Sequence, residues 1–353
     1  MAKSNPPVEL IVGDWHHRFT GVSATVANLL PTLAENERLA VMTQRECAFP
    51  KLGFLQTLRL CWSKPDSKPF RIFHARRNIE LGLGFLMRRI LRRPVRVVFT
   101  SAAKRRHSWV PRMLIDAADV QIATTPEAAS FLRDDAPVIP HSVDCQRFQP
   151  AADVGLLRKK FRLDADKIVT IVGRVRPEKD TDLFVDAMCR LLPQHPGTLG
   201  CIVGTATDAF AGFADDLKAK LAARGLDRRV VWLGQLPHDE LAELVSCSSI
   251  CVAPARYEGF GLVPLEAMAC GVPVVASRTG AYEQFVRPGE TGFLTDCGDE
   301  DGLVEALDIL LSDDAMRADF GYRGRQLVTS QYSVEMEASR IRDVYLDLWK
   351  RAA

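Results

Sequence analysis

The chain alternates short apolar runs with longer stretches in which apolar residues recur every three or four positions. Short runs that end at glycine, proline or a polar residue predict buried parallel strands, and the longer period predicts amphipathic helices. Strands are predicted at residues 8–13, 70–74, 94–100, 119–124, 167–173, 198–204, 229–234, 249–254, 271–276 and 291–295. Helices are predicted at residues 22–33, 79–91, 237–245, 263–269, 299–311, 313–328 and 333–349, with another starting at Pro126. This alternation indicates an α/β fold built from Rossmann-type units.

The length and the charge distribution both indicate two domains. A chain of 353 residues is long for a single hydrophobic core. Residues 1–150 hold 22 Lys and Arg against 13 Asp and Glu, a net charge of +9, whereas residues 151–353 hold 24 against 31, a net charge of −7. We therefore predict domains at 1–150 and 151–332, followed by a terminal helical segment at 333–353.

The most informative stretch is residues 256–271, Arg-Tyr-Glu-Gly-Phe-Gly-Leu-Val-Pro-Leu-Glu-Ala-Met-Ala-Cys-Gly, which joins two predicted buried strands. Gly259 and Gly261 precede a short helix, where backbone N–H groups and the helix dipole favour an anion. Glu258 lies before this loop and Glu266 lies within the helix. Two carboxylates on either side of a phosphate suit the hydroxyl groups of a nucleotide sugar. The alternative is an ordinary strand–loop–helix unit with surface acids.

This Glu-x7-Glu pattern with an internal Gly-Phe-Gly resembles retaining glycosyltransferases of family 4. The resemblance implies the GT-B fold, in which two Rossmann-like domains face one another across a cleft and the last helix crosses back to the first domain. It implies that Glu258 contacts the transferred sugar and that Glu266 binds the nucleotide ribose. The donor-binding residues that the resemblance implies are Gly21, Gly173, Gly259, Phe260, Gly261, Leu262 and Glu266.

Residues 173–179, Gly-Arg-Val-Arg-Pro-Glu-Lys, follow a predicted strand and resemble the G-R-x-x-x-E-K loop of the same family. In that loop Arg174 and Lys179 would hold the donor diphosphate, because cations stabilise the charge that grows as the glycosidic bond breaks. A solvated basic turn is the alternative. Two Asp-x-Asp pairs, at 164–166 and 180–182, precede a strand and begin a helix, respectively. We therefore expect no metal, and no cofactor besides the nucleotide sugar, which is a co-substrate.

The predicted acceptor site follows the strand at 70–74, where residues 74–78 read His-Ala-Arg-Arg-Asn. Open α/β sheets bind ligands at the carboxyl ends of their strands. Arginine can hold phosphate or carboxylate with two parallel hydrogen bonds, so His74, Arg76 and Arg77 are the predicted acceptor-binding residues. A structural role is the alternative for His74. This segment also resembles bacterial lipopolysaccharide core mannosyltransferases.

Many members of family 4 carry a catalytic histidine directly after the strand that corresponds to residues 94–100. This chain has Ser101 and Ala102 at that place. The resemblance transfers the role to His107, with His74 as the other possibility. The predicted catalytic set is therefore Arg174, Lys179, Glu258 and His107.

Much of the positive charge of the first half is concentrated in arginine and lysine pairs between residues 76 and 112. Such a block indicates an anionic partner, which a membrane surface, a phosphorylated acceptor or a nucleic acid could supply, or else a solvated helix face. Together with the family resemblance, it favours an anionic glycolipid at the inner membrane over nucleic acid. No apolar run approaches the ~18 residues of a membrane span. The first residues lack the apolar region of a signal peptide, and nine scattered cysteines without C-x-x-C suggest buried free thiols of a cytoplasmic protein.

These features predict a retaining glycosyltransferase that moves a hexose, mannose from GDP-mannose, onto a sugar acid of the lipopolysaccharide inner core at the cytoplasmic face of the inner membrane. One alternative is a UDP-hexose-dependent enzyme acting on another cell-envelope glycan. A nucleotide-binding oxidoreductase is disfavoured because the G-x-G-x-x-G fingerprint is missing. A non-catalytic protein that binds anionic surfaces is disfavoured because the full set of donor-site residues is present.

Overall fold

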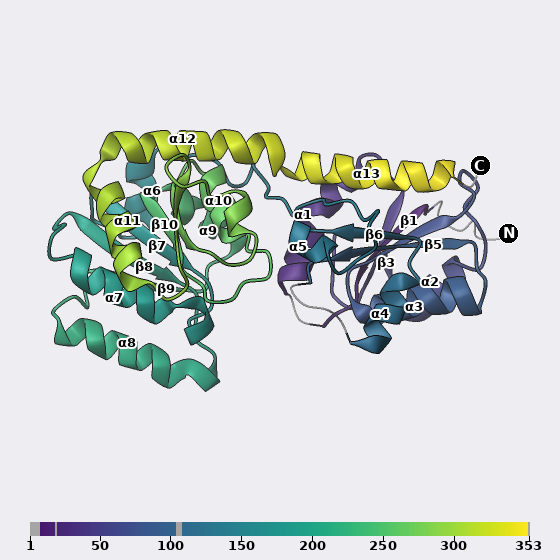
Figure 1. Ribbon diagram of the computed structural model, residues 1–353, viewed down its shortest axis with the longest axis horizontal. Coiled ribbons are helices and arrows are strands. Elements are labelled where there is room, and N and C mark those ends of the chain that lie inside the picture. Colours follow the sequence, from purple (N-terminus) through teal and green to yellow (C-terminus); the bar gives the residue numbers. More distant parts are fainter. Residues whose placement is uncertain (1–7, 18–19, 104–107, 352–353) are drawn as a thin grey trace. The chain divides into compact units, whose positions relative to one another are not determined.

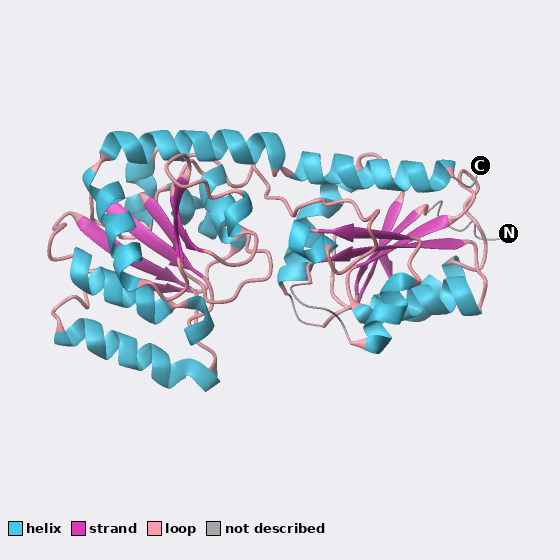
Figure 2. Cartoon of the chain, viewed as in Figure 1, coloured by secondary structure: helices cyan, strands magenta, loops and turns pink. Residues whose placement is uncertain are grey.

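The computed structural model describes residues 8–17, 20–103 and 108–351. The chain forms two compact units, one made of Met1–Ser142 with Val334–Ala353 and the other of Val143–Ser333. Within the described residues, each unit contains a six-stranded parallel sheet with helices on both faces (Figures 1 and 2). The predicted α/β fold with two Rossmann-like units is thus confirmed.

The first unit has the strand order β3-β2-β1-β4-β5-β6. Its strands are β1 (Leu10–Asp14), β2 (Leu39–Thr43), β3 (Lys51–Leu52), β4 (Arg71–Ala75), β5 (Val95–Ser101) and β6 (Val120–Ala123). Its helices are α1 (Gly21–Ala34), α2 (Phe54–Leu60), α3 (Asn78–Phe85), the π-helical turn η1 (Leu86–Ile90), α4 (Trp109–Asp116), α5 (Pro126–Ala129) and α13 (Val334–Lys350). The strand order reverses between β1 and β4, which is where open α/β sheets bind ligands.

The two faces of this sheet bury separate apolar cores because successive side chains of a strand point to opposite sides. Leu10 and Val12 of β1 pack with α1 and α13, whereas Ile11 packs with α2, α3 and α4. Tyr345 and Trp349 anchor α13 in the first of these cores. The last helix of the chain is therefore an integral part of the first unit.

The second unit has the strand order β12-β11-β10-β7-β8-β9, which reverses between β7 and β10. Its strands are β7 (Lys167–Val172), β8 (Thr198–Val203), β9 (Val230–Gly234), β10 (Ile250–Ala253), β11 (Val274–Ser277) and β12 (Gly292–Thr295). Its helices are α6 (Val154–Lys160), α7 (Thr181–Leu191), α8 (Ala211–Ala223), α9 (His238–Ser246), α10 (Val263–Ala269), α11 (Glu300–Ser312) and α12 (Asp314–Gln331). Three 3-10 turns complete the unit: η2 (Pro177–Lys179), η3 (Asp208–Phe210) and η4 (Tyr282–Gln284).

The units divide at residues 142–143, before the boundary at 150 that the sequence predicted. The backbone N–H of Val143 donates to the carbonyl of Tyr332 at 2.9 Å. Phe148 is fully buried in the core of the second unit, and Arg325 donates to the Phe148 carbonyl at 2.8 Å. Residues 143–150 therefore belong to the second unit, because their apolar side chains and carbonyls are satisfied there.

Other differences from the sequence interpretation are local. The predicted helix at 79–91 is α3 followed by the π-helical turn η1. Strands β2 and β3 and helices α2, α4 and α8 were not predicted. All nine cysteines lie in the described residues and are free thiols, and Cys297 is exposed. No helix among the described residues is both long and apolar enough to span a bilayer.

Candidate active site

The candidate donor site lies in the second unit, at the carboxyl ends of β7 and β10, where the strand order reverses. Gly173 follows β7 with φ of +151°, a conformation that L side chains rarely adopt. Its carbonyl oxygen lies 1.9 Å from the point that a Cβ at Gly204 would occupy. The loops that leave β7 and β8 therefore pack backbone against backbone, which requires glycine.

Lys179 and Glu258, which the sequence interpretation assigned to diphosphate and sugar, form an ion pair. Their side chains are 21% and 20% exposed, so the pair is only partly shielded from water. The other oxygen of Glu258 accepts the backbone N–H of Gly259 at 2.9 Å. The fold thus brings together a cation and a carboxylate that are 79 positions apart in the sequence.

Arg174 presents an exposed side chain, and among the described residues no hydrogen bond or ion pair holds its guanidinium. Among the described residues, Arg174 thus has no ion pair like the one that Lys179 forms with Glu258. An unpaired guanidinium beside a strand end has all five N–H donors available for phosphate oxygens.

A second ion pair, which the sequence interpretation missed, joins the same two loops. Nε of Arg256 lies 2.5 Å from Oδ1 of Asp180, and the backbone N–H of Arg256 donates to the Glu178 carbonyl at 3.1 Å. Asp180 is buried and has φ of +50°, and its side chain does not cap the helix α7 that it precedes. Burial raises the pKa of Asp180, and the hydrogen bond to Arg256 opposes that rise. In the sequence, the only sign of this pair is Asp180 at the start of a helix. An aspartate at that position could equally well cap the helix.

Two glycines let the Glu258 loop lie against Tyr282. At Gly261, where φ is +86°, a Cβ would lie 2.3 Å from the Tyr282 ring and 2.8 Å from Cγ of Glu258. At Gly280 a Cβ would lie 2.9 Å from the Phe260 carbonyl oxygen. Tyr282 is buried beside Glu258, and burial together with that carboxylate raises the pKa of its hydroxyl.

The side chain of Phe260 belongs to the core, although we expected it to contact the donor. It is 6% exposed and its ring centroid lies 6.1 Å from that of Phe285. Gly259 and Leu262 remain partly exposed at the start of α10. A phosphate at this loop would therefore meet backbone N–H groups and not the aromatic ring.

Glu266 is 6% exposed on α10, and within the described part of the chain no hydrogen bond or ion pair reaches its carboxyl group. Burial raises its pKa from 4.5 to about 7. A buried carboxyl group without partners is costly unless a ligand supplies them. Hydroxyl groups of a sugar could do so.

A pocket of about 320 Å³ lies at the carboxyl ends of β8 and β9. Its lining includes Val175, Gly204, Trp232 and Gly234. The Nζ atom of Lys218 lies 5.5 Å from the Trp232 ring centroid. The pocket combines an aromatic surface with backbone groups of two glycines.

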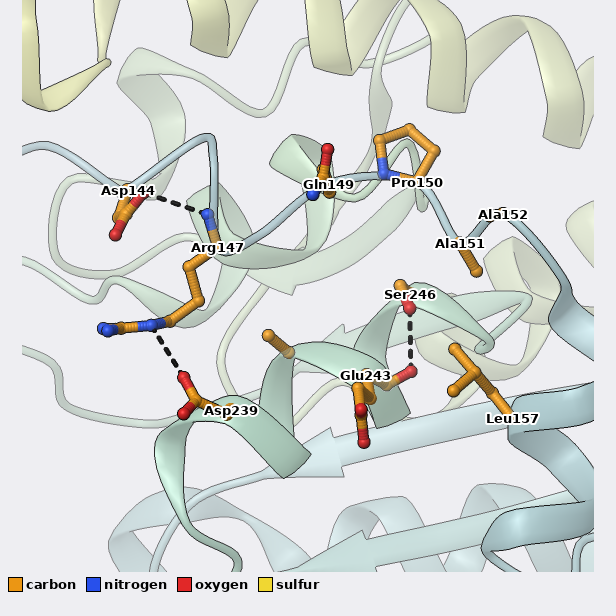
Figure 3. Close-up of a pocket in the computed structure, with 11 residues that line it drawn as sticks. Asp144, Arg147, Gln149, Pro150, Ala151, Ala152, Leu157, Asp239, Glu243 and Ser246 are labelled. Atoms are coloured by element: carbon orange, nitrogen blue, oxygen red, sulfur yellow. Dashed lines mark hydrogen bonds and ion pairs between the residues drawn. The ribbon is translucent and has the colours of Figure 1, made fainter.

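Figure 3 shows another pocket of the second unit, of about 420 Å³, between residues 144–152 and helix α9. Its polar groups are largely satisfied within the protein. Arg147 lies 3.0 Å from Asp239, and Asp144 accepts the backbone N–H of Arg147 at 3.0 Å (Figure 3). We assign no chemistry to this pocket.

In the first unit, Arg77 forms several hydrogen bonds within the protein at the point where the strand order reverses between β1 and β4. Its guanidinium donates to Asp14 at 2.7 Å, to Thr20 at 2.9 Å and to Ser23 at 3.0 Å. Glu80 is fully buried and accepts the backbone N–H groups of Trp15, Arg76 and Arg77. We expected Arg77 to bind the acceptor, but its donors are already occupied.

His74 is likewise structural, which corrects its assignment to the acceptor. It is fully buried, with Nδ1 at 2.5 Å from the Tyr345 hydroxyl and Nε2 at 2.7 Å from the Thr100 hydroxyl. Burial, with a smaller effect of Arg76, holds its pKa well below 6.5. A neutral imidazole bonded on both sides connects β4 to β5 and α13.

Arg76 differs from both neighbours. It is 7% exposed, and its three guanidinium nitrogens find no hydrogen-bond partner among the described residues. Unsatisfied buried donors are rare in folded proteins and call for a ligand or ordered water. Of the three predicted acceptor residues, Arg76 alone keeps its donors available.

The remaining predictions concern Gly21, His107 and the absence of a metal. Gly21 begins α1, and a Cβ there would meet none of the described residues within 4 Å, so nothing in this structure demands glycine. His107 lies outside the described residues. Among those that are described, no group of three His, Cys, Asp or Glu side chains is arranged to hold a metal.

The chain is similar to known proteins over nearly its whole length. Residues 155–327 match the family model described as "Glycosyl transferases group 1". The chain is 37% identical over 348 residues to the lipopolysaccharide core biosynthesis mannosyltransferase LpsB of Rhizobium meliloti, covering 97% of this chain and 98% of that protein. It is 38% identical over 345 residues to the lipopolysaccharide core biosynthesis mannosyltransferase LpcC of Rhizobium leguminosarum bv. viciae, covering 97% of each.

Two solved structures are similar as well. Anabaena HepE in complex with UDP and glucose superposes with a TM-score of 0.81 at 19% identity, covering 96% of this chain and 100% of that one. The C-terminal domain of a glycosyl transferase group 1 family protein (LpcC) from Francisella tularensis gives a TM-score of 0.53 at 30% identity. It covers 54% of this chain and 98% of that domain.

Proposed function

Since the chain belongs to the glycosyl transferases group 1 family, we propose that it transfers mannose from GDP-mannose to a lipopolysaccharide core acceptor with retention of configuration. The chain is a glycosyltransferase of the GT-B fold, and family membership excludes the oxidoreductase and the non-catalytic alternatives. The observation that carries the choice of mannose and of lipopolysaccharide core is the nearly full-length likeness to LpsB and LpcC.

The donor geometry supports a division of roles. Arg174 and Lys179 would hold the diphosphate, Glu266 the ribose hydroxyls and Glu258 the mannose. Lys179 is paired with Glu258 in this structure, so donor binding would insert phosphate oxygens and sugar hydroxyls between the two charges. Lys179 and Glu258 would then keep or gain hydrogen bonds, to phosphate oxygens and sugar hydroxyls respectively. These bonds would offset the loss of the direct ion pair.

The proposed reaction replaces one bond to the anomeric carbon by another. The bond from mannose C1 to the β-phosphate oxygen breaks with both electrons going to that oxygen, and the acceptor hydroxyl oxygen forms the new bond to C1 on the same face. The acceptor proton passes to the leaving phosphate oxygen. Arg174 and Lys179 would stabilise the charge that develops on the diphosphate, which is where electrostatic catalysis is most effective.

On the acceptor side, Arg76 is the residue best suited to a sugar-acid carboxylate, because its guanidinium is buried and unpaired among the described residues. Such an acceptor is a glycolipid, so the enzyme would work at the cytoplasmic face of the inner membrane. The net charge of +9 in residues 1–150 supports attraction to that anionic surface.

The test is transfer of labelled mannose from GDP-mannose to a membrane core-lipid acceptor, with UDP-glucose and UDP-galactose assayed in parallel. We expect transfer from GDP-mannose and none from the UDP-sugars. Efficient transfer from a UDP-sugar with none from GDP-mannose would reject the donor assignment. Transfer of mannose to neutral glycans but not to the core lipid would reject the acceptor.

A further inference from the structure

Tyr282 lies next to the loop that carries Glu258, and backbone contacts fix its place there. It begins the 3-10 turn η4, which follows β11 in the chain. The backbone N–H of Ala281 donates to the Phe260 carbonyl at 3.1 Å, and the N–H of Tyr282 donates to the Thr279 carbonyl at 3.2 Å. The turn that holds Tyr282 therefore packs directly on the loop of Glu258 and Phe260.

The ring of Tyr282 reaches the side chain of Glu258 because the residue next to both is Gly261. A Cβ at Gly261 would lie 2.3 Å from Cε1 and 2.9 Å from Cζ of Tyr282, and 2.8 Å from Cγ of Glu258. Cζ is the ring atom that carries the hydroxyl group. The hydroxyl end of the ring and the carboxyl end of Glu258 thus border the same glycine.

The Tyr282 hydroxyl is a hydrogen-bond donor to the Glu258 carboxylate. Tyr282 is 2% exposed, so its side chain contacts protein and not bulk water. Burial raises the pKa of its hydroxyl well above 10, and the charge of Glu258 and a hydrogen bond to that carboxylate raise the pKa further. Because an ionised carboxylate only accepts hydrogen bonds, the protonated hydroxyl donates. Glu266 affects this hydroxyl through its charge alone.

The Glu258 carboxylate is thus held by three groups of the described chain. Nζ of Lys179 pairs with Oε2, and the backbone N–H of Gly259 donates to Oε1 at 2.9 Å. The Tyr282 hydroxyl is the third donor. In the proposed donor complex Lys179 contacts the diphosphate, so the carboxylate loses its cation. Gly259 and Tyr282 are then the protein donors that still hold it within the described residues.

We propose that Tyr282 is a positioning residue for glycosyl transfer, whose hydroxyl holds the Glu258 carboxylate against the donor sugar while Lys179 contacts the diphosphate. A carboxylate fixed by two donors presents its remaining lone pairs in a defined direction, and such preorganisation favours reaction. Since Tyr282 is buried, it acts through Glu258 and not on the donor itself. The inference rests on the proposed function, because it requires that Glu258 contacts the transferred sugar.

The experiment is steady-state transfer kinetics of Tyr282→Phe, together with GDP calorimetry. This change keeps the ring that fits against Gly261 and removes only the hydroxyl. We expect kcat to fall roughly tenfold or more, because a hydrogen bond to a charged group is lost, while the affinity for bare GDP stays near that of the wild type. Tyr332→Phe is the matched control, because Tyr332 packs in the same core and its hydroxyl donates to the Gln284 carbonyl at 3.2 Å. It should keep the wild-type kcat.

A double-mutant cycle shows whether Tyr282 acts through Glu258. Tyr282→Phe should add little to the loss of kcat that Glu258→Gln already causes. In the Glu266→Gln background, the same change should lower kcat by its full factor. A tyrosine with a merely structural role would lower kcat by the same factor in all three backgrounds.

Wild-type kcat in Tyr282→Phe overturns the inference, as does an equal loss in Tyr332→Phe or an additive loss on top of Glu258→Gln. Thermal unfolding shows whether each variant is folded. A Tyr282→Phe chain that does not fold also overturns the inference, because the hydroxyl would then serve the fold. Failure of the proposed function is a separate outcome, in which the wild type transfers no mannose from GDP-mannose. The same variants, assayed with the nucleotide sugar that the wild type does use, would still decide the role of Tyr282.

Discussion

At the scale of single residues, Glu266, the proposed ribose-binding residue, should influence both ligand binding and stability. Burial raises its pKa to about 7, whereas an unfolded chain has the ordinary value of 4.5. Between those values the native state binds more protons than the unfolded state, so this group lowers stability as pH rises from 4.5 to 7. The buried carboxylate of Glu266 is thus destabilising at neutral pH when no ligand is bound.

We therefore expect Glu266→Gln to raise the free energy of unfolding at pH 8, by an amount on the order of 3 kcal/mol or less. The gain should shrink as pH falls towards 5, where the wild-type carboxyl is protonated as well. Urea unfolding across that pH range measures it, and calorimetry with GDP should show weaker binding by the same variant. A variant that is less stable than the wild type at pH 8 would contradict an unpaired carboxylate.

The ion pair between Lys179 and Glu258 leads to a second prediction at this scale. Lys179→Ala and Arg174→Ala should each lower kcat by about a hundredfold, because each removes a cation from the proposed diphosphate site. Glu258→Gln should reduce transfer while leaving the affinity for bare GDP nearly unchanged. The readout is steady-state kinetics together with GDP calorimetry.

Lys160→Ala is the matched control for these variants, since Lys160 also pairs with a glutamate of the second unit, Glu243. That pair lies on α6 and α9, the helices that lead into the amino ends of β7 and β10, whereas the donor loops leave the carboxyl ends of these strands. Lys160→Ala should retain wild-type kinetics. Near-normal turnover in both Lys179→Ala and Arg174→Ala would remove these residues from the donor site. An equal loss of GDP affinity in Glu258→Gln and Glu266→Gln would overturn the division of roles between the two acids.

At the scale of elements, the bond between Arg256 and Asp180 connects the exit of β10 to the start of α7. Asp180 is buried, and its side chain is not part of the helix cap. We expect Arg256→Ala to cost about 1–3 kcal/mol of stability, because it leaves a buried carboxylate with one partner fewer. The loop that carries Lys179 should also lose its fixed position, so KM for the donor should rise.

Two replacements of Asp180 separate charge from backbone strain. Asn tolerates the left-handed conformation that Asp180 adopts at φ of +50°, whereas Ala does not. Asp180→Ala should therefore destabilise more than Asp180→Asn in urea unfolding. In a double-mutant cycle, Arg256→Ala should have little further effect on top of Asp180→Asn. Additive losses in that cycle would show that the two side chains act independently.

The elements also show which parts of the fold could be predicted from sequence. Of the strands in the described residues, all but β2 and β3 were predicted, because they are short buried apolar runs. The loops that we propose to bind the donor stand out in the sequence because their glycines and charges are contiguous. The contacts that decide the role of His74 were not, because Tyr345 is 271 positions away. The same holds for Arg77, which precedes α3 and whose partner Asp14 is 63 positions away at the end of β1. Arg76 and Arg77 are adjacent in sequence, yet the guanidinium of Arg77 is hydrogen-bonded and that of Arg76 has no partner among the described residues. No local sequence pattern distinguishes the two.

At the scale of the whole molecule, the two units differ in how the chain builds them. The second unit is a single continuous segment, Val143–Ser333, with its own cores. The first unit needs Val334–Ala353 from the far end of the chain, because Tyr345 and Trp349 of α13 complete its core. Independent folding is thus expected of the second unit and not of residues 1–142 alone.

We predict that a fragment of residues 143–333 folds cooperatively and binds GDP with an affinity within about tenfold of the full chain, because Arg174, Lys179 and Glu266 all lie in it. A fragment of residues 151–333 is the informative control. It lacks Val143 and Phe148, which are buried in the core, so it should melt at a lower temperature. Circular dichroism melting and calorimetry with GDP measure both properties. Equal stability of the two fragments would show that residues 143–150 do not belong to the second unit, and a folded 143–333 fragment that ignores GDP would place part of the nucleotide site elsewhere.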